Sequence, residues 1–139
     1  MTDIQQRIQA SFNAQGFMTA LGARLLSVAE GEVHIELPFS GQFCQQHGYI
    51  HAGAITTIVD NACGYAALTK APPGSEVVTA EFKVNFVRPA IGDRFVAIGK
   101  VQSAGKLLTV CTGEVYAYSE TGSKLVAMMQ ATIVSVPSP

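Results

Sequence analysis

The sequence predicts an α+β domain in which a strongly curved antiparallel sheet wraps one long buried helix. Its 139 residues suit one domain with a real core. Residues 52–69 form a proline-free apolar run, and the chain after it is rich in alternating, strand-like patterns. A single apolar helix can be covered only by a sheet that curves around it, which defines the predicted fold class.

The run 52–69 is long enough for about five helical turns. Apolar side chains recur on nearly all sides of it, which is typical of a buried helix. Asp60 is the only charged side chain within 52–69. The sequence Ala-Pro-Pro-Gly at 71–74 then ends the helix. We therefore place this helix at the centre of the domain.

The remaining elements are shorter. Residues 3–14 predict an amphipathic helix that ends at Gly16, and the alternation within 21–37 predicts a half-buried strand after a turn at Glu30-Gly31. Four further strands, predicted to form a consecutive meander, cover residues 76–87, 93–103, 106–118 and 124–136.

Composition narrows the functional classes. A net charge of −1 provides no basic face for nucleic acid, and 48% hydrophobic against 14% charged residues predicts a subunit interface. Cys44, Cys63 and Cys111 form no CxxC pair, as expected in a reducing compartment. The chain shows no signal-peptide pattern and no apolar run of roughly 18 to 20 residues, so we expect a cytoplasmic protein without a membrane partner.

Asp60 is the most informative single residue. It lies in the middle of the predicted helix, where Asp is a poor helix former, and none of its helical neighbours (Thr56, Thr57, Cys63 and Gly64) is basic. A carboxylate on an apolar helix needs a distant partner, and burial raises its pKa toward values suited to a base. Asp60 is therefore a candidate catalytic acid, with a solvated or backbone-bonded carboxylate as the alternative.

The start of the same helix is a second candidate element. His51, Ala52 and Gly53 follow a polar loop, so the backbone N–H groups of Ala52 and Gly53 should point out of the helix. Such a terminus stabilises an oxyanion that develops on a carbonyl. An ordinary helix start with a flexible glycine is the alternative.

The two candidate elements are too far apart to act within one chain. Nine residues separate His51 from Asp60, which corresponds to roughly 13 Å of helical rise. A site that uses both needs two antiparallel copies of the helix, one from each subunit. The sequence therefore predicts a homodimer at minimum.

Two segments resemble the signature of hotdog-fold acyl-CoA thioesterases, and most of all the phenylacetate-pathway (PaaI-like) branch. They are Gln46-His47-Gly48-Tyr49-Ile50-His51-Ala52-Gly53-Ala54 and Asp60-Asn61-Ala62-Cys63-Gly64-Tyr65-Ala66-Ala67. The segment 79–90 and Gly105-Lys106-Leu107 resemble the following strand and the next turn. The similarity covers the chain from about residue 16.

The resemblance implies a thioesterase that releases a free acid and CoA, with no metal and no cofactor besides the CoA of the substrate. It also suggests a homotetramer. Ala52 stands where the family often has Gly, and Gln45 stands where one branch has Asn. The implied roles are: Asp60, general base or nucleophile; Ala52 and Gly53, carbonyl polarisation; Gln45, orientation of thioester or water; His51, assistance at the carbonyl oxygen; Thr79, support of the acid; Arg88, Gly105 and Lys106, contacts to CoA.

Several alternatives stay open at this point. Cys44, His47 and His51 lack the spacing and the fourth ligand of a zinc site, and Cys63 fits a small core residue. Tyr49 and Tyr65 line an acyl pocket or pack in the core. Two rival functions are a hydroxyacyl-thioester dehydratase and an acyl-CoA-binding protein without turnover. A dehydratase usually has a Pro-Gly element before the long helix, and the absence of proline between Pro38 and Pro72 counts against it.

Overall fold

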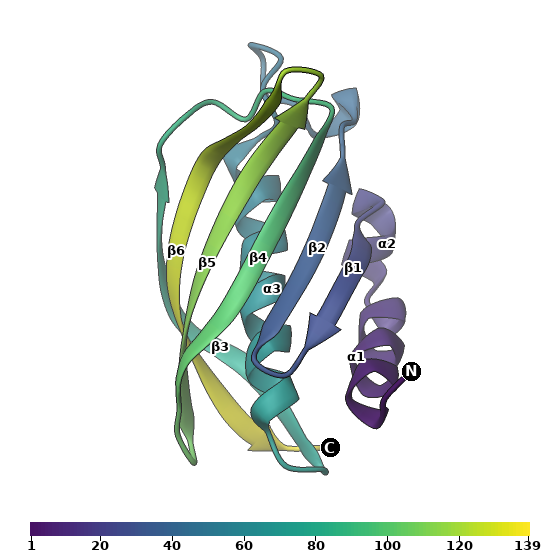
Figure 1. Cartoon of the computed structure of the whole chain (residues 1–139), viewed down its shortest axis with the longest axis vertical. Helices are drawn as coiled ribbons and strands as arrows, with labels where there is room; N and C mark the ends of the chain where they lie inside the picture. The colour runs from purple at the N-terminus through teal and green to yellow at the C-terminus, as the bar shows by residue number, and fades with distance from the viewer.

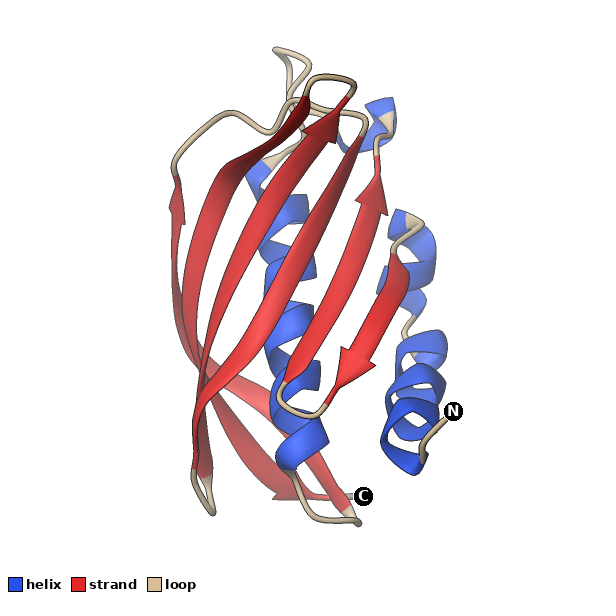
Figure 2. Ribbon diagram, in the orientation of Figure 1, coloured by secondary structure: helices blue, strands red, loops and turns tan.

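The computed structural model describes all residues from 1 to 139 and has the predicted α+β architecture (Figure 1). One long helix, α3 (Ala52–Lys70), lies against the inner face of a six-stranded antiparallel sheet. The strands curve around this helix, while the N-terminal helices lie to one side (Figure 2). The predicted central helix and curved sheet are confirmed.

The N-terminal segment contains two helices, α1 (Asp3–Ala14) and α2 (Gly16–Leu21). A capping box fixes the start of α1, because Thr2 and Gln5 each accept the other's backbone N–H. The prediction that Gly16 ends helical structure is wrong. The extended backbone of Gln15 interrupts the helix for one residue, and Gly16 then begins α2.

Two strands, not one, precede α3. The turn at Glu30-Gly31 is confirmed, with Gly31 in the left-handed region at a φ of 80°. It joins two paired strands, so the alternating segment 21–37 contains a hairpin. The six strands are β1 (Arg24–Ala29), β2 (Glu32–Pro38), β3 (Ser75–Phe86), β4 (Arg94–Ala104), β5 (Leu108–Ser119) and β6 (Gly122–Pro137).

The predicted four-strand meander is wrong in its connectivity. The sheet order is β1-β2-β4-β5-β6-β3, so only β4, β5 and β6 form a meander and β3 pairs with β6. The segment between β3 and β4 is tied to the start of α3, because the N–H of Ile50 donates to the oxygen of Ala90 at 3.1 Å. This crossing carries the chain from one edge of the sheet to its centre and leaves β3 at the edge.

Two glycines bring α3 unusually close to the sheet. A Cβ at Gly99 on β4 would lie 2.4 Å from the backbone of Ala62, and one at Gly113 on β5 would lie 2.5 Å from Val59. Only a residue without a side chain fits at such a separation. Around this contact the buried faces of the helix and strands form the continuous core.

One stripe of α3 is not covered by the sheet, contrary to the expectation of a helix buried on all sides. Its residues recur every three to four positions and are small or polar. They are Gly53, Thr57, Asp60, Asn61 and Gly64, all of them exposed or only partly buried. The prediction from apolar content missed this stripe because alanine, glycine and threonine occur on both covered and open faces.

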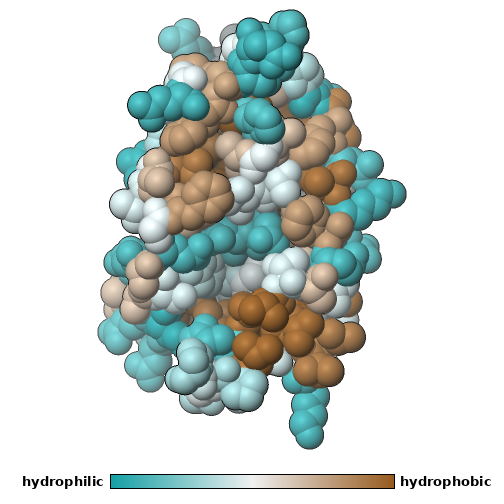
Figure 3. All heavy atoms as spheres, turned by 180° about the vertical axis from the view of Figure 1, so that it is seen from behind, coloured by the Kyte–Doolittle hydropathy of each residue, from teal (hydrophilic) through white to brown (hydrophobic).

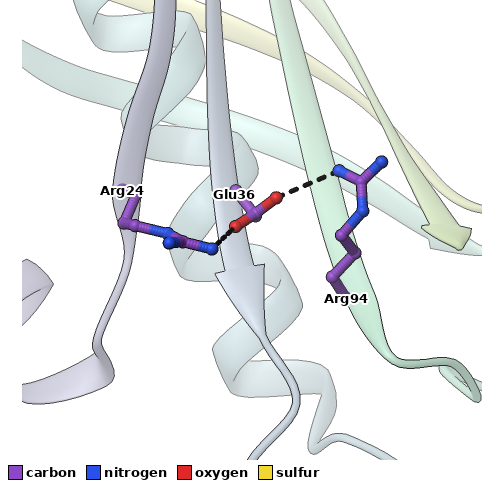
Figure 4. A network of polar contacts seen from close by, with 3 residues as sticks. All are labelled: Arg24, Glu36 and Arg94. Atoms are coloured by element: carbon purple, nitrogen blue, oxygen red, sulfur yellow. Dashed lines mark hydrogen bonds and ion pairs between the residues drawn. The ribbon is translucent and has the colours of Figure 1, made fainter.

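The outer face of the sheet carries an ion-pair network (Figure 4). Glu36 on β2 points away from α3 and is buried between Arg24 of β1 and Arg94 of β4. Arg94 also lies over the ring of Tyr118, 4.2 Å from its centroid. Two cations thus satisfy the buried carboxylate and connect the strands at this end of the sheet.

The edge strand β3 is long, unpaired on its outer side and rich in exposed apolar side chains. Val78, Phe82 and Phe86 are each more than 40% exposed. Figure 3, which shows the molecule from behind, has two apolar areas divided by a hydrophilic band. Such an edge is a template for pairing with another chain.

None of the helices has both the length and the hydropathy of a membrane span.

Candidate active site

Asp60 meets its distant partner on β3. The hydroxyl of Thr79 donates to Asp60 Oδ1 at 2.8 Å, while Oδ2 has no hydrogen-bond partner in the chain. The pairing of β3 with β6 shifts register between Thr79 and Glu81, which inserts Ala80 as an extra residue. A bulge of this kind redirects side chains, and here it adjoins the carboxylate.

Two features of Asp60 fit the predicted role of a base. Burial raises the pKa of the Asp60 carboxyl above its ordinary value, and the hydrogen bond from Thr79 opposes this rise. No cation pairs with the carboxylate. A partly buried acid without an ion partner is typical of functional sites.

At the helix start, the expectation of two free N–H groups needs correction. His51 is the N-cap of α3, and its Nδ1 accepts the N–H of Gly53 at 2.8 Å. A Cβ at position 53 would lie 3.0 Å from that nitrogen, so glycine makes room for the imidazole. Only the N–H of Ala52 remains unpaired at this position.

The His51 cap also fixes the tautomer of the neutral ring. With Nδ1 accepting a hydrogen bond, the proton of the neutral imidazole is on Nε2. Nε2 has no partner in the chain and His51 is exposed. The ring therefore offers a donor in addition to the Ala52 N–H.

Gln45 is held in the loop before α3. Its Oε1 accepts the N–H groups of His47 and Tyr49, and its own backbone N–H donates to the oxygen of Tyr49 at 2.8 Å. This leaves Nε2 as an uncommitted donor. Sequence alone did not predict this orientation, which depends on the local fold of the loop.

Gln45 and Ala52 line one cleft of about 170 Å³ together with Arg88. The guanidinium of Arg88 donates to the oxygen of Leu125 at 2.8 Å, and the side chain stays exposed. Tyr49 lines the same cleft and is only partly buried, so it does not pack in the core. Three of the predicted site residues thus meet at the N-terminal end of α3.

Gly105 and Lys106 lie elsewhere. They form the turn between β4 and β5, where the N–H of Gly105 donates to the oxygen of Leu108 at 2.8 Å. In Figure 1 this turn is at the lower end of the molecule, while α3 begins at the upper end. Within one chain they do not join the cleft that Arg88 lines.

Asp60 and Thr79 line a second cleft of about 290 Å³, between α1, α3 and β3. Sequence reasoning missed a polar cluster on its wall. The hydroxyl of Tyr65 bonds to Ser11 at 3.0 Å and accepts from Gln15 at 2.6 Å, and Gln15 also donates to Asn61 at 2.9 Å. The adjacency of Asn61 to Asp60 was the available signal, but its partner Gln15 lies 46 residues earlier, at the junction of α1 and α2.

The remaining chemistry-bearing residues are structural. Cys63 is fully buried, and burial raises the pKa of its thiol, so it packs as a core residue as expected. Burial likewise raises the pKa of Cys111 to about 11. No group of three His, Cys, Asp or Glu side chains is arranged to hold a metal ion.

Comparison with known proteins identifies the family. Residues 47–123, which include the start of α3, Asp60 and Thr79, match the model of the thioesterase superfamily. The chain belongs to this superfamily. A Saccharolobus solfataricus protein that carries the name of an esterase is 31% identical over 65% of this chain, and the match spans 64% of that relative.

The chain is similar in sequence to a member of the PaaI-like branch, and the structure of that protein, 24% identical over the superposition, supports the fold. The acyl-coenzyme A thioesterase PaaI of Escherichia coli is 26% identical over 73% of this chain and 71% of its own length. Its structure superimposes with a TM-score of 0.86 over 97% of this chain and 94% of that chain. The predicted family and hotdog fold are therefore confirmed.

A closer structural match is a thioesterase family protein from Silicibacter pomeroyi. It is 38% identical, with a TM-score of 0.95 over 97% of this chain and 99% of that chain. The predicted class of enzyme, a thioester hydrolase, is confirmed at the level of the family. The roles of individual residues, the acyl-CoA substrate and the oligomeric state stay predictions.

Proposed function

We propose that the protein hydrolyses acyl-CoA thioesters at a site composed of two subunits. Asp60 of one subunit acts on a thioester carbonyl that the helix start of the other subunit polarises. The main support is the state of Asp60, a half-buried carboxylate with a raised pKa, a single hydroxyl partner and a cleft in front of it.

Symmetry gives the reason for two subunits. Gly53 and Asp60 lie on either side of Thr57 along the uncovered stripe of α3. Two antiparallel copies of α3 centred close to Thr57 would bring Asp60 of one copy beside Gly53 of the other. The same two-fold axis would let the open edges of two β3 strands pair, which would cover their exposed apolar side chains.

The chemistry follows from the donors at the helix start. The Ala52 N–H and His51 Nε2–H would bind the carbonyl oxygen and stabilise the oxyanion. Gln45 Nε2 would orient the thioester or the attacking water. Asp60 would then remove a proton from the water that attacks the carbonyl carbon, or attack that carbon itself to give an acyl–Asp60 anhydride that water hydrolyses. In both cases the C–S bond breaks and CoA leaves as its thiol, while Thr79 would hold the carboxylate in place.

The CoA moiety would extend away from the helix start. Arg88 lies beside that start and would contact the CoA phosphates or pantetheine. In an antiparallel dimer, the lower end of the partner subunit would lie beside the start of α3. Gly105 and Lys106 of the partner subunit would then lie on the same side as Arg88. As the resemblance to hotdog thioesterases suggests, we propose a homotetramer of two such dimers.

The substitution Asp60→Asn tests this function. We expect it to lower the rate of thiol release from acyl-CoA by about 10²- to 10⁴-fold, because the amide is neither base nor nucleophile. The fold should persist, since asparagine can still accept from Thr79. The assay is thiol release from a panel of short, medium, long and aryl acyl-CoA substrates, with the oligomer followed by light scattering.

Asp93→Asn makes the same chemical change at an exposed loop position and serves as the control. It should leave the rate unchanged. Asp60→Asn should also unfold at a higher temperature near neutral pH. Since the folded-state pKa of Asp60 is raised, its ionisation costs stability as pH rises above the unfolded-state value. Full activity in Asp60→Asn would refute the assignment.

A further inference from the structure

The cleft in front of Asp60 has a wall that a simple hydrocarbon pocket would not have. Ser11, Gln15, Asn61 and Tyr65 present hydroxyl and amide groups to it, from α1, the α1–α2 junction and α3. All four are at least partly buried. The apolar contribution comes mainly from Val77 and Leu68.

These polar groups are fixed in position by one another. Gln15 donates from Nε2 to both Asn61 and Tyr65, and Asn61 Nδ2 donates back to Gln15 Oε1 at 3.3 Å. The ring of Tyr65 packs against Phe12 with centroids 6.1 Å apart, and Phe12 is buried in the core. The cluster is therefore rigid, and its orientation is set by the fold.

The cluster keeps unused hydrogen-bonding capacity. Asn61 Nδ2 has two hydrogens, of which one is given to Gln15. Ser11 and Tyr65 each have one hydroxyl hydrogen, and only one of the two is used in the hydrogen bond between them. The other hydroxyl hydrogen is free to donate. A ligand in the cleft would thus find free donors on this wall.

An apolar ligand and a polar ligand would differ in their effect on the wall. A hydrocarbon tail would remove water from these donors without replacing its hydrogen bonds, which is unfavourable. A hydroxyl or carbonyl at the same depth would replace them. A terminal carboxylate would instead meet two acids, Asp60 and Glu76, which line the same cleft.

We propose that this cleft is the acyl pocket and that it selects acyl groups ending in an uncharged hydrogen-bonding group. The inference rests on the proposed thioesterase function. Tyr65 follows Asp60 by five residues, or roughly 7 Å along the helix, which sets the depth of the polar group below the reacting carbonyl. A six-carbon acyl chain with a terminal hydroxyl fits that depth.

Three CoA thioesters of equal chain length provide the test: hexanoyl-CoA, 6-hydroxyhexanoyl-CoA and adipoyl-CoA. We expect kcat/KM to be about tenfold higher for the hydroxyl-bearing substrate than for hexanoyl-CoA, with adipoyl-CoA the poorest. In Tyr65→Phe and Gln15→Met this preference should fall toward unity, through a higher KM for the hydroxyl substrate.

Gln6→Met makes the same substitution on the exposed face of α1 and should leave the preference unchanged. Equal kcat/KM for the hydroxyl and plain substrates in the unaltered protein would overturn the proposal. So would an equal loss on both substrates in the two pocket variants.

A binding measurement separates this proposal from the catalytic one. Calorimetric titration of Asp60→Asn with the three thioesters reports the preference without turnover. Preference for the hydroxyl ligand there, with no hydrolysis by the unaltered protein, would retain the pocket and reject the thioesterase assignment. Hydrolysis without any preference in either measurement would reject the pocket alone.

Discussion

The two ends of the candidate site differ in how the chain builds them. The helix start is assembled from neighbours in sequence, because His51 caps Gly53 and Gln45 is held by the loop that precedes them. The acid half depends on contacts between distant segments, since Asp60 meets Thr79 across 19 residues. Local geometry thus places the hydrogen-bond donors at the helix start, while tertiary contacts fix the position of the Asp60 carboxylate.

This difference separates the effects expected from mutation. A change at the helix start should remove catalysis and leave the fold intact. A change near the acid should alter stability or the pH dependence as well, because the same contacts hold α3 against the sheet. The following variants test that division, in order of expected effect.

Ala52→Pro removes one N–H from the helix start and little else. Ala52 is the first residue of α3, a position where proline is well tolerated in helices. If its N–H binds the oxyanion, we expect kcat to fall by about 10²- to 10³-fold with an unchanged circular dichroism spectrum. Steady-state kinetics on the preferred acyl-CoA measures the effect.

Asp3→Pro places proline at the first residue of α1 and is the matched control. It should leave kcat unchanged. A rate for Ala52→Pro close to that of the unaltered protein would show that the carbonyl is bound by other groups.

Gly99→Ala should act on the acid half through the fold. The added Cβ would collide with the backbone of Ala62, two residues after Asp60. We expect the free energy of unfolding to fall by about 1–3 kcal/mol, measured by denaturant titration. Gly16→Ala, where nothing lies within 4 Å of the added Cβ, should not destabilise the protein. An unchanged Gly99→Ala midpoint would contradict the close approach of α3 to β4.

Thr79→Val should give the smallest effect, mainly on the pH profile. The hydrogen bond from Thr79 lowers the pKa of Asp60, so its loss should raise that pKa further. Because the carboxylate is the active form, the acidic limb of kcat against pH should move to higher pH. The plateau rate should fall by no more than about tenfold.

Thr132→Val removes a similar hydroxyl–carboxylate contact, to Glu81, on a strand next to β3. It should leave the acidic limb in place. A limb that moves to lower pH in Thr79→Val would contradict the direction of the hydrogen-bond effect.

The same contrast explains what the sequence could predict. The central helix and the positions of the four strands after it follow from proline placement and local alternation, and both are confirmed. The pairing of β3 with β6 is set by a crossing over the start of α3, for which no local pattern exists. The short helix at 16–21 was missed because glycine usually ends a helix, whereas here Gln15 interrupts it.

The site shows the same limit. Asp60 and the helix start could be selected from residue type and spacing, and the structure finds a distant partner for the acid. The capture of the Gly53 N–H by His51 is a matter of side-chain conformation, and the cluster around Gln15 joins segments far apart in sequence. Neither has a signature in the linear pattern.

The sharing of one site between two subunits is tested most directly by mixing two inactive variants. Asp60→Asn and Ala52→Pro, each nearly inactive alone, are unfolded together and refolded as a mixture. If Asp60 of one subunit works with Ala52 of the other, mixed dimers carry one intact site, and about a quarter of the unaltered activity should return. A mixture no more active than the two variants assayed separately would contradict the shared site.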